Sequence, residues 1–189
     1  MRCPSAVIEI GMASYDASNA ECLVFAFKEG LLSRAAHDLE IRVGRFEIDV
    51  DDASHAIVAS FDPNSLRLVN AYPDGRAQPE ELSEDEVQKI NDHIVGDILR
   101  PREFPELRFV SSAVEVVDDG FRVSGALTLH GETRELRADV HEKEERWVAE
   151  VPLDQTDFGI KPFRAALGTI RIKAGVRVRV SVPRGGAGS

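Results

Sequence analysis

The chain has 189 residues, enough for one medium domain that buries a real core or encloses a small cavity. Apolar residues make up 43% of it and charged residues 30%, as in an ordinary soluble globular protein. The formal net charge is −10, which disfavours nucleic acid as a partner, because phosphate binding needs a basic surface. No run approaches about 18 apolar residues, so the sequence predicts no transmembrane segment.

The charge is unevenly distributed along the chain. Residues 161–189 contain seven Lys and Arg and no acidic residue, so they carry +7 against −17 for the remainder. Such asymmetry can indicate an anion-binding face, but it also arises when a basic strand pairs with acidic neighbours. We favour the second interpretation, since a basic strand in an acidic protein is expected to find such partners.

Cysteine content and the first residues bear on cofactors and compartment. Cys3 and Cys22 are the only cysteines, too few for a disulfide framework or a zinc cluster. The first residues lack the apolar stretch of a secretory signal, which predicts a cytoplasmic protein. We expect no cofactor and no bound metal.

Alternating apolar and polar residues predict several strands in the first half of the chain. The segment ECLVFAFK (21–28) places Leu23, Phe25 and Phe27 on one face. In HDLEIRVGRFEIDV (37–50) the apolar side changes at Gly44-Arg45, which predicts a β-bulge in this N-terminal strand. Two further strands are predicted over 55–61 and 65–69, joined by a turn.

One clear helix follows. Ser83 and Glu86 have the spacing of a capping box, and isoleucines recur at helical spacing up to Arg100-Pro101, where the helix should end. This amphipathic helix should lie outside a sheet or close one end of a barrel.

The second half of the chain predicts a meander of strands over 107–117, 121–130, 135–141, 147–151 and 169–182. Asp118-Asp119-Gly120 is a hairpin turn signal. About nine short strands with clean alternation predict a mainly all-β protein whose single antiparallel sheet curls into a barrel.

Three segments resemble the YceI-like family of polyisoprenoid-binding proteins: FPELRFVSS (104–112), VSGALTLHGETREL (123–136) and DFGIKPF (157–163). The similarity extends from about Phe25 to Val182. It implies a lipocalin-like β-barrel that binds an isoprenoid or fatty-acyl amphiphile and is not an enzyme. We divide the chain into an N-terminal extension or first strand (1–20), the barrel domain (21–183) and a disordered tail (184–189). The sequence leaves a homodimer open.

The candidate ligand-binding residues are the apolar side chains expected to face the barrel interior, although any single one could also be plain core. They are Phe25, Phe27, Leu39, Ile41, Phe109, Leu127, Leu129, Phe158, Ile160 and Phe163. If the ligand carries a phosphate, Lys161 and Arg164 are the candidates for its headgroup. His37 could line the barrel mouth.

No catalytic or metal-binding motif is present in the sequence, and we assign no catalytic residue. His130 lies on the polar side of its strand, just before Gly131, which predicts a structural or solvent-facing role at a turn. Two alternatives remain: an interaction protein whose barrel is filled by side chains, or, with less support, a hydrolase or isomerase that uses His37 or His130.

Overall fold

The computed structural model describes residues 11–29, 38–71, 82–165 and 170–185. Within these residues the chain forms twelve strands, one α-helix that continues into a π-helical segment, and two short 3-10 helices. The elements are β1 (Met12–Asp16), β2 (Glu21–Lys28), β3 (Leu39–Val43), β4 (Phe46–Asp51), β5 (Ile57–Phe61), η1 (Pro63–Ser65), β6 (Leu66–Ala71), α1 (Glu84–His93), η3 (Ile94–Leu99), β7 (Leu107–Val117), β8 (Gly120–Leu129), β9 (Glu132–Lys143), β10 (Arg146–Asp154), η4 (Gln155–Phe158), β11 (Arg164–Ala165) and β12 (Ile170–Pro183).

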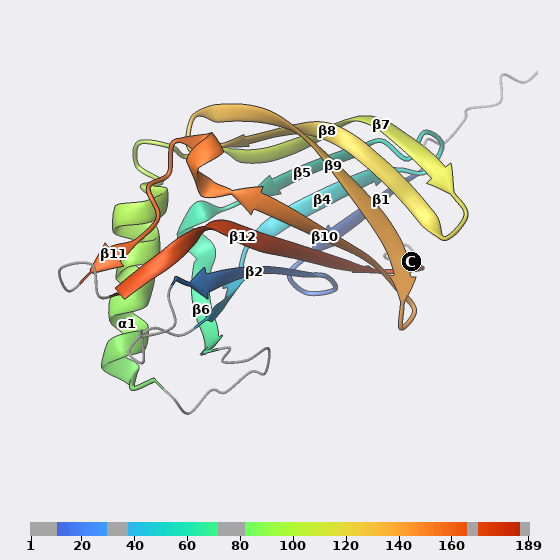
Figure 1. The fold of residues 1–189 in the computed structure, drawn as a ribbon. Coiled ribbons are helices and arrows are strands. Elements are labelled where there is room, and N and C mark those ends of the chain that lie inside the picture. The colour runs from blue at the N-terminus through green and yellow to red at the C-terminus, as the bar shows by residue number, and fades with distance from the viewer. Residues whose placement is uncertain (1–10, 30–37, 72–81, 166–169, 186–189) are drawn as a thin grey trace, which may run out of the picture.

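The strands form one antiparallel sheet that curls into a half-barrel (Figure 1). Its order is β1-β4-β5-β7-β8-β9-β10-β12-β2-β3-β6, and β11 pairs with β12 outside this path. The predicted mainly all-β barrel with one helix is confirmed. The sheet curls because its strands are apolar on the inner side, and curling buries that side without a second sheet.

The segment around Gly44-Arg45 differs from the predicted bulge. Two separate strands meet there: β3 pairs with β2 and β6, whereas β4 pairs with β1 and β5. The chain therefore passes at this corner from one end of the sheet to the other. A bend of this kind changes the apolar side just as a bulge does, so alternation alone could not distinguish the two.

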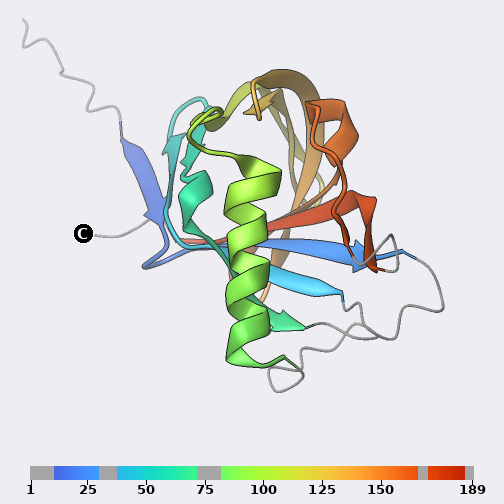
Figure 2. The same ribbon diagram turned by 90° about the vertical axis from the view of Figure 1, so that its left-hand side faces the viewer.

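The helix begins and ends where the sequence predicts. Ser83 and Glu86 form the capping box, and the helical segment stops before Arg100, whose backbone N–H donates to the Val95 carbonyl over 3.0 Å. Figure 2 shows α1 lying across one end of the barrel. The buried residues of the helical segment, Ile94 and Leu99, belong to its π-helical continuation η3. No helix in the described residues is both long and apolar enough to span a membrane.

The hairpins of the second half set the inward direction of the side chains. His130 and Gly131 both have positive φ, 53° and 80°, and form the two-residue turn between β8 and β9. Asp118 and Asp119 join β7 to β8 as predicted.

The basic strand β12 forms ion pairs with acidic residues of neighbouring strands, in agreement with the favoured interpretation of the charge asymmetry. These ion pairs are Arg177–Glu150 and Arg179–Glu21, and Arg184, which directly follows β12, pairs with Glu142.

Candidate functional site

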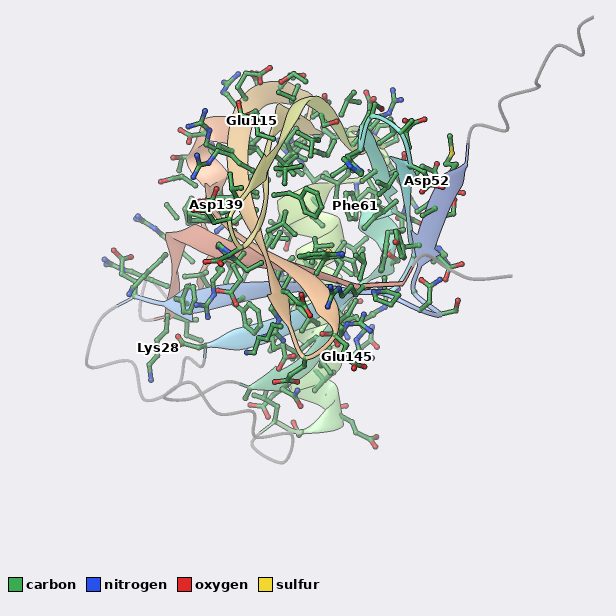
Figure 3. All side chains as sticks on the ribbon, turned by 90° about the vertical axis from the view of Figure 1, so that its right-hand side faces the viewer. Lys28, Asp52, Phe61, Glu115, Asp139 and Glu145 are labelled. Carbon is green, nitrogen blue, oxygen red and sulfur yellow. The ribbon has the colours of Figure 1, made fainter. Side chains whose placement is uncertain are left out.

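The curled sheet encloses a cavity of about 550 Å³. Its wall is almost entirely aliphatic and aromatic, and alternate residues of the strands supply it. Along β10, for example, Trp147, Ala149, Val151 and Leu153 face inward. Figure 3 views the barrel from the end away from α1 and labels Phe61, another wall residue, which is the last residue of β5.

Seven of the ten predicted interior residues line this cavity. They are Leu39, Ile41, Phe109, Leu127, Leu129, Ile160 and Phe163. Most of them belong to strands with one polar and one apolar face, or to the segment that follows η4, and for such strands period-two alternation identifies the inner side.

Phe25 and Phe27 do not face the cavity, and their predicted position is corrected here. The inward side chains of β2 are Cys22, Val24 and Ala26. The Arg177 guanidinium lies over both phenylalanine rings, 5.1 Å from the centroid of Phe25 and 5.8 Å from that of Phe27. Because β2 is apolar on both faces, its alternation carries no information about which face is inside.

This arrangement of β2 helps to create the cavity. Its small and medium side chains point inward and its large aromatic ones outward, where Phe25 is nevertheless only 2% exposed. Ala59, Ala138 and Ala149 on other strands add further short side chains to the wall. Space is left in the interior because the wall residues are too short to fill it.

Phe158 belongs to the core but not to the wall. It is 2% exposed at the end of η4, and its carbonyl accepts a hydrogen bond from Nδ1 of His130 over 3.2 Å. Phe158 therefore connects η4 to the turn between β8 and β9, and its ring does not line the cavity.

The predicted headgroup residues lie outside the wall. Lys161 and Arg164 are exposed, next to the wall residues Ile160 and Phe163. Arg164 is opposite Arg171 in the β11–β12 pair. His37 lies outside the described residues.

The polar wall residues were missed by the sequence reasoning. Glu86, Lys89 and His93 of α1 line the cavity, as does Gln155 of η4. The spacing i, i+3, i+7 of the three helix residues places them on one side of α1, beside the isoleucine stripe. That spacing was visible in the sequence, but it indicates a cavity-facing side only if the helix lies over the opening.

His93 joins the helix to the rim of the cavity. Its Nδ1 lies 2.5 Å from Oδ2 of Asp97, and its ring packs against Phe163 with the centroids 4.8 Å apart. The imidazole is still 46% exposed. His93 and Asp97 therefore form a histidine–carboxylate pair. The wall also contains Cys22, whose thiol is a group that can act as a nucleophile when it is deprotonated. Burial raises the pKa of that thiol to about 12, so it stays protonated near neutral pH.

His130 is buried, at 9% exposure, rather than facing solvent. Because a carbonyl can only accept, Nδ1 donates to Phe158, and Nε2 is left to accept from Arg100, whose Nη2 is 3.5 Å away. Phe104 stacks on the ring with centroids 3.9 Å apart. Burial, and secondly the nearby Arg100 charge, lower the pKa of His130. We call Arg100, Phe104, His130 and Phe158 the His130 junction.

The structure contains no assembled metal site in the part that it describes: there, no three His, Cys, Asp or Glu side chains are placed to hold an ion.

Comparison with known proteins agrees with this fold. The crystal structure of BcnA from Burkholderia cenocepacia superposes with a TM-score of 0.58 at 15% identity, covering 88% of this chain and 97% of that chain. The YCEI protein of Campylobacter jejuni is also similar, with a TM-score of 0.41 at 16% identity over 60% of this chain and 65% of that chain. A search of curated proteins returned no match. The profile of the YceI-like domain matches residues 16–183, and the chain therefore belongs to the YceI-like family.

Proposed function

We propose that this protein binds one long-chain amphiphile, isoprenoid or fatty-acyl, in its apolar cavity and carries or sequesters it without changing it chemically. The observation that carries this proposal is the cavity of about 550 Å³ with its aliphatic and aromatic wall. Membership of a family known for polyisoprenoid-binding barrels supports it. Such a volume lies within the range of roughly 300–1,000 Å³ that is usual for ligand sites.

The energetics favour a long tail. Each methylene removed from water contributes about 0.8 kcal/mol, so ten contribute about 8 kcal/mol. Association costs on the order of 4–15 kcal/mol in lost freedom, so a short tail is held weakly and a longer one gains a surplus. The wall therefore selects for tail length more than for any particular pattern of polar groups.

A phosphate-bearing ligand would place its head near Lys161 and Arg164. Both flank the wall residues at the helix end of the cavity and both are exposed, so a charged head there would stay hydrated.

The alternative of a barrel filled by side chains gains no support, because the interior contains open space. A hydrolase or isomerase would need a nucleophile or a bound water beside its histidine. In the described residues His130 is hydrogen-bonded to a backbone carbonyl and contacts an arginine, which suits a structural role.

The proposal is tested by extracting the purified protein with organic solvent for mass spectrometry, and by titrating delipidated protein with the apolar dye N-phenylnaphthylamine. Trp147, the single tryptophan of the chain, lies in the cavity wall, so energy transfer from it reports dye inside the barrel. We expect a co-purified lipid or saturable energy transfer that long-chain lipids abolish. Absence of both would refute the proposal.

A further inference from the structure

The cavity ends at an aromatic ring on the side of the barrel away from α1. The β9–β10 hairpin lies at this end (Figure 1), and the first inward side chain of β10 after the turn is Trp147. Toward this end the wall stops at Val123 on β8 and at Val140 on β9. The next inward positions of these two strands are Phe121 and Glu142, and neither lines the cavity. Trp147 is therefore a wall residue at the limit of the apolar interior.

A second pocket adjoins this end of the barrel. It is bordered by Asp118, Asp119, Gly120, His141, Glu142 and Trp147. Trp147 is the one residue of the described part of the chain that borders both this pocket and the cavity. The two spaces differ in chemistry, because three of the six residues around the second pocket carry carboxylates, whereas the cavity wall is almost entirely apolar. Trp147 thus lies at the boundary between an apolar interior and an acidic outer pocket.

The indole ring of Trp147 is held in place by its neighbours. Phe121 packs edge-on against it, with the ring centroids 5.1 Å apart, and Phe121 in turn packs against His55 with the centroids 5.5 Å apart. The guanidinium of Arg184 lies 5.9 Å from the centroid of the indole. Arg184 is itself paired at 2.7 Å with the carboxylate of Glu142, which is the cross-strand neighbour of Trp147. A ligand chain would have to break these contacts to push the ring aside.

The two ends of the cavity offer different surroundings to a ligand. The polar side chains of the wall all lie at the helix end, on α1, which crosses that end (Figure 2), and on η4: they are Glu86, Lys89, His93 and Gln155. Around Trp147 the wall consists of Ala149, Val140 and Val182, and the indole adds a single N–H donor. Since a polar head buried without partners loses its hydration, the head belongs at the helix end and the end of the tail at Trp147.

A tail in this position has a limited useful length. Each methylene that enters the apolar interior should raise the affinity about fourfold. Once the tail reaches the indole, a further methylene either stays in water at the helix end or has to enter the carboxylate-rich pocket behind Trp147. Neither choice removes it into apolar surroundings, so the affinity should stop rising with length.

We propose that Trp147 determines the length of the tail that the cavity accepts, because its ring ends the apolar interior. This inference rests on the proposed function, since it concerns the tail that the cavity would hold. It is independent of the chemistry of the head, and it makes Trp147 a specificity-determining residue.

The test uses saturated fatty acids from laurate to lignocerate, which share one head and differ only in length. Each acid is titrated against bound N-phenylnaphthylamine, followed by the fluorescence of the dye itself. Trp147→Ala removes the ring at the end of the cavity, and Trp147→Phe keeps a smaller one. Phe109→Ala is the matched control, because it removes a ring from the side of the wall, next to Ala59 in the middle of β5. Thermal unfolding confirms that each variant is folded.

In the wild-type protein the affinity should rise with chain length and then level off. In Trp147→Ala it should level off at a longer acid, and the first acid beyond the wild-type limit should bind on the order of tenfold more tightly than it binds the wild-type protein. Trp147→Phe should lie between the two, and Phe109→Ala should keep the wild-type limit. An unchanged limit in Trp147→Ala, an equal shift in Phe109→Ala, or a wild-type affinity that rises through the whole series would overturn the inference alone.

A second measurement needs no variant, because bromine quenches indole fluorescence on contact. The acid at the wild-type limit is prepared with bromine on its last carbon or on the carbon next to the carboxyl group. We expect the first to quench Trp147 strongly and the second weakly. Stronger quenching by the second, or a bound dye that no acid displaces, would overturn the inference alone. If neither the dye nor any acid binds the wild-type protein, the proposed function fails with it.

Discussion

The two histidines near the helix end of the barrel use their rings in opposite ways. In the His130 junction the ring is buried and both nitrogens face protein groups, the Phe158 carbonyl and the Arg100 guanidinium. At the cavity opening, His93 is half-exposed, and among the described residues only its Nδ1 has a hydrogen-bond partner, the carboxylate of Asp97. His130 was the more conspicuous of the two in the sequence, because it sits in a family-like hairpin.

This difference separates a residue whose ring joins parts of the fold from one whose ring lies in the wall of the cavity. The His130 junction joins the end of η3, the β8–β9 turn and the end of η4, so its contacts hold together segments that are distant in the chain. The cavity, by contrast, contains space that no side chain of the described residues fills. Substitutions in the junction should therefore change stability and spare binding, and substitutions in the cavity should do the reverse.

The largest effect is expected from filling the cavity. Ala149→Phe places a ring in the middle of the wall, beside Val140 and Val180, and would displace about four methylenes of a tail, worth about 3 kcal/mol or roughly a hundredfold in dye or lipid affinity. Stability should be kept, because the ring enters existing space. Val148→Phe, the neighbouring position outside the wall, is the control and should bind normally. Equal affinities of the two variants would contradict the assigned cavity.

The His130 junction should show the reverse behaviour. His130→Asn keeps a residue that tolerates the positive φ of 53° but loses the bond to Phe158 and the stacking on Phe104, which together contribute about 2 kcal/mol. Urea unfolding measures the loss, and binding at low denaturant should stay unchanged. His141→Asn, an exposed position on β9, should change stability by less than about 0.5 kcal/mol. Similar losses in both variants would show that the junction contributes little.

A smaller effect is expected from pH. The pKa of His130 in the folded protein lies below its ordinary value of 6.5, so the unfolded chain takes up the proton first as pH falls. The contribution of His130 to the free energy of unfolding should therefore be fully present above about pH 6.5 and should decline as the pH falls below that value. It should level off once His130 of the folded protein is also protonated. Thermal unfolding measured between about pH 7.5 and about pH 5.5, one unit either side of 6.5, should show a flatter pH dependence of stability in His130→Asn. The same slope in both proteins would contradict the effect.

The smallest effect concerns Cys22, which reports access to the wall. Its thiol is 2% exposed and burial raises its pKa to about 12, so iodoacetamide at neutral pH should modify it far more slowly than an unfolded-state thiol. The measurement uses a Cys3→Ser background and mass spectrometry. Rapid modification of the folded protein would show that the wall opens often. Slower modification in the presence of a lipid would place that lipid against β2.

Strands with one polar and one apolar face could be oriented from the sequence. The inward residues Leu136, Ala138 and Val140 of β9 and the valines of β12 are those that alternation predicts, and they do line the cavity. For β2 the same reasoning led to the wrong side, because both faces are apolar and only the neighbouring arginines of β12 distinguish them. The local pattern of a sequence shows the two-residue period of a strand. Where a strand is apolar on both faces, however, the neighbouring strands decide which face points inward.

The sequence by itself determined the period of each strand, the capped helix that ends before Arg100-Pro101, the turns at Asp118-Asp119 and His130-Gly131, and the barrel class. These features depend on backbone geometry and on contacts within a few residues, so a short window of sequence contains their cause. Only the tertiary structure decided that β3 and β4 lie at opposite ends of the sheet, that short side chains leave the interior open, and that Lys89 and His93 face it. Each of these depends on which distant segments meet, and on volume left over after packing, which no local pattern records.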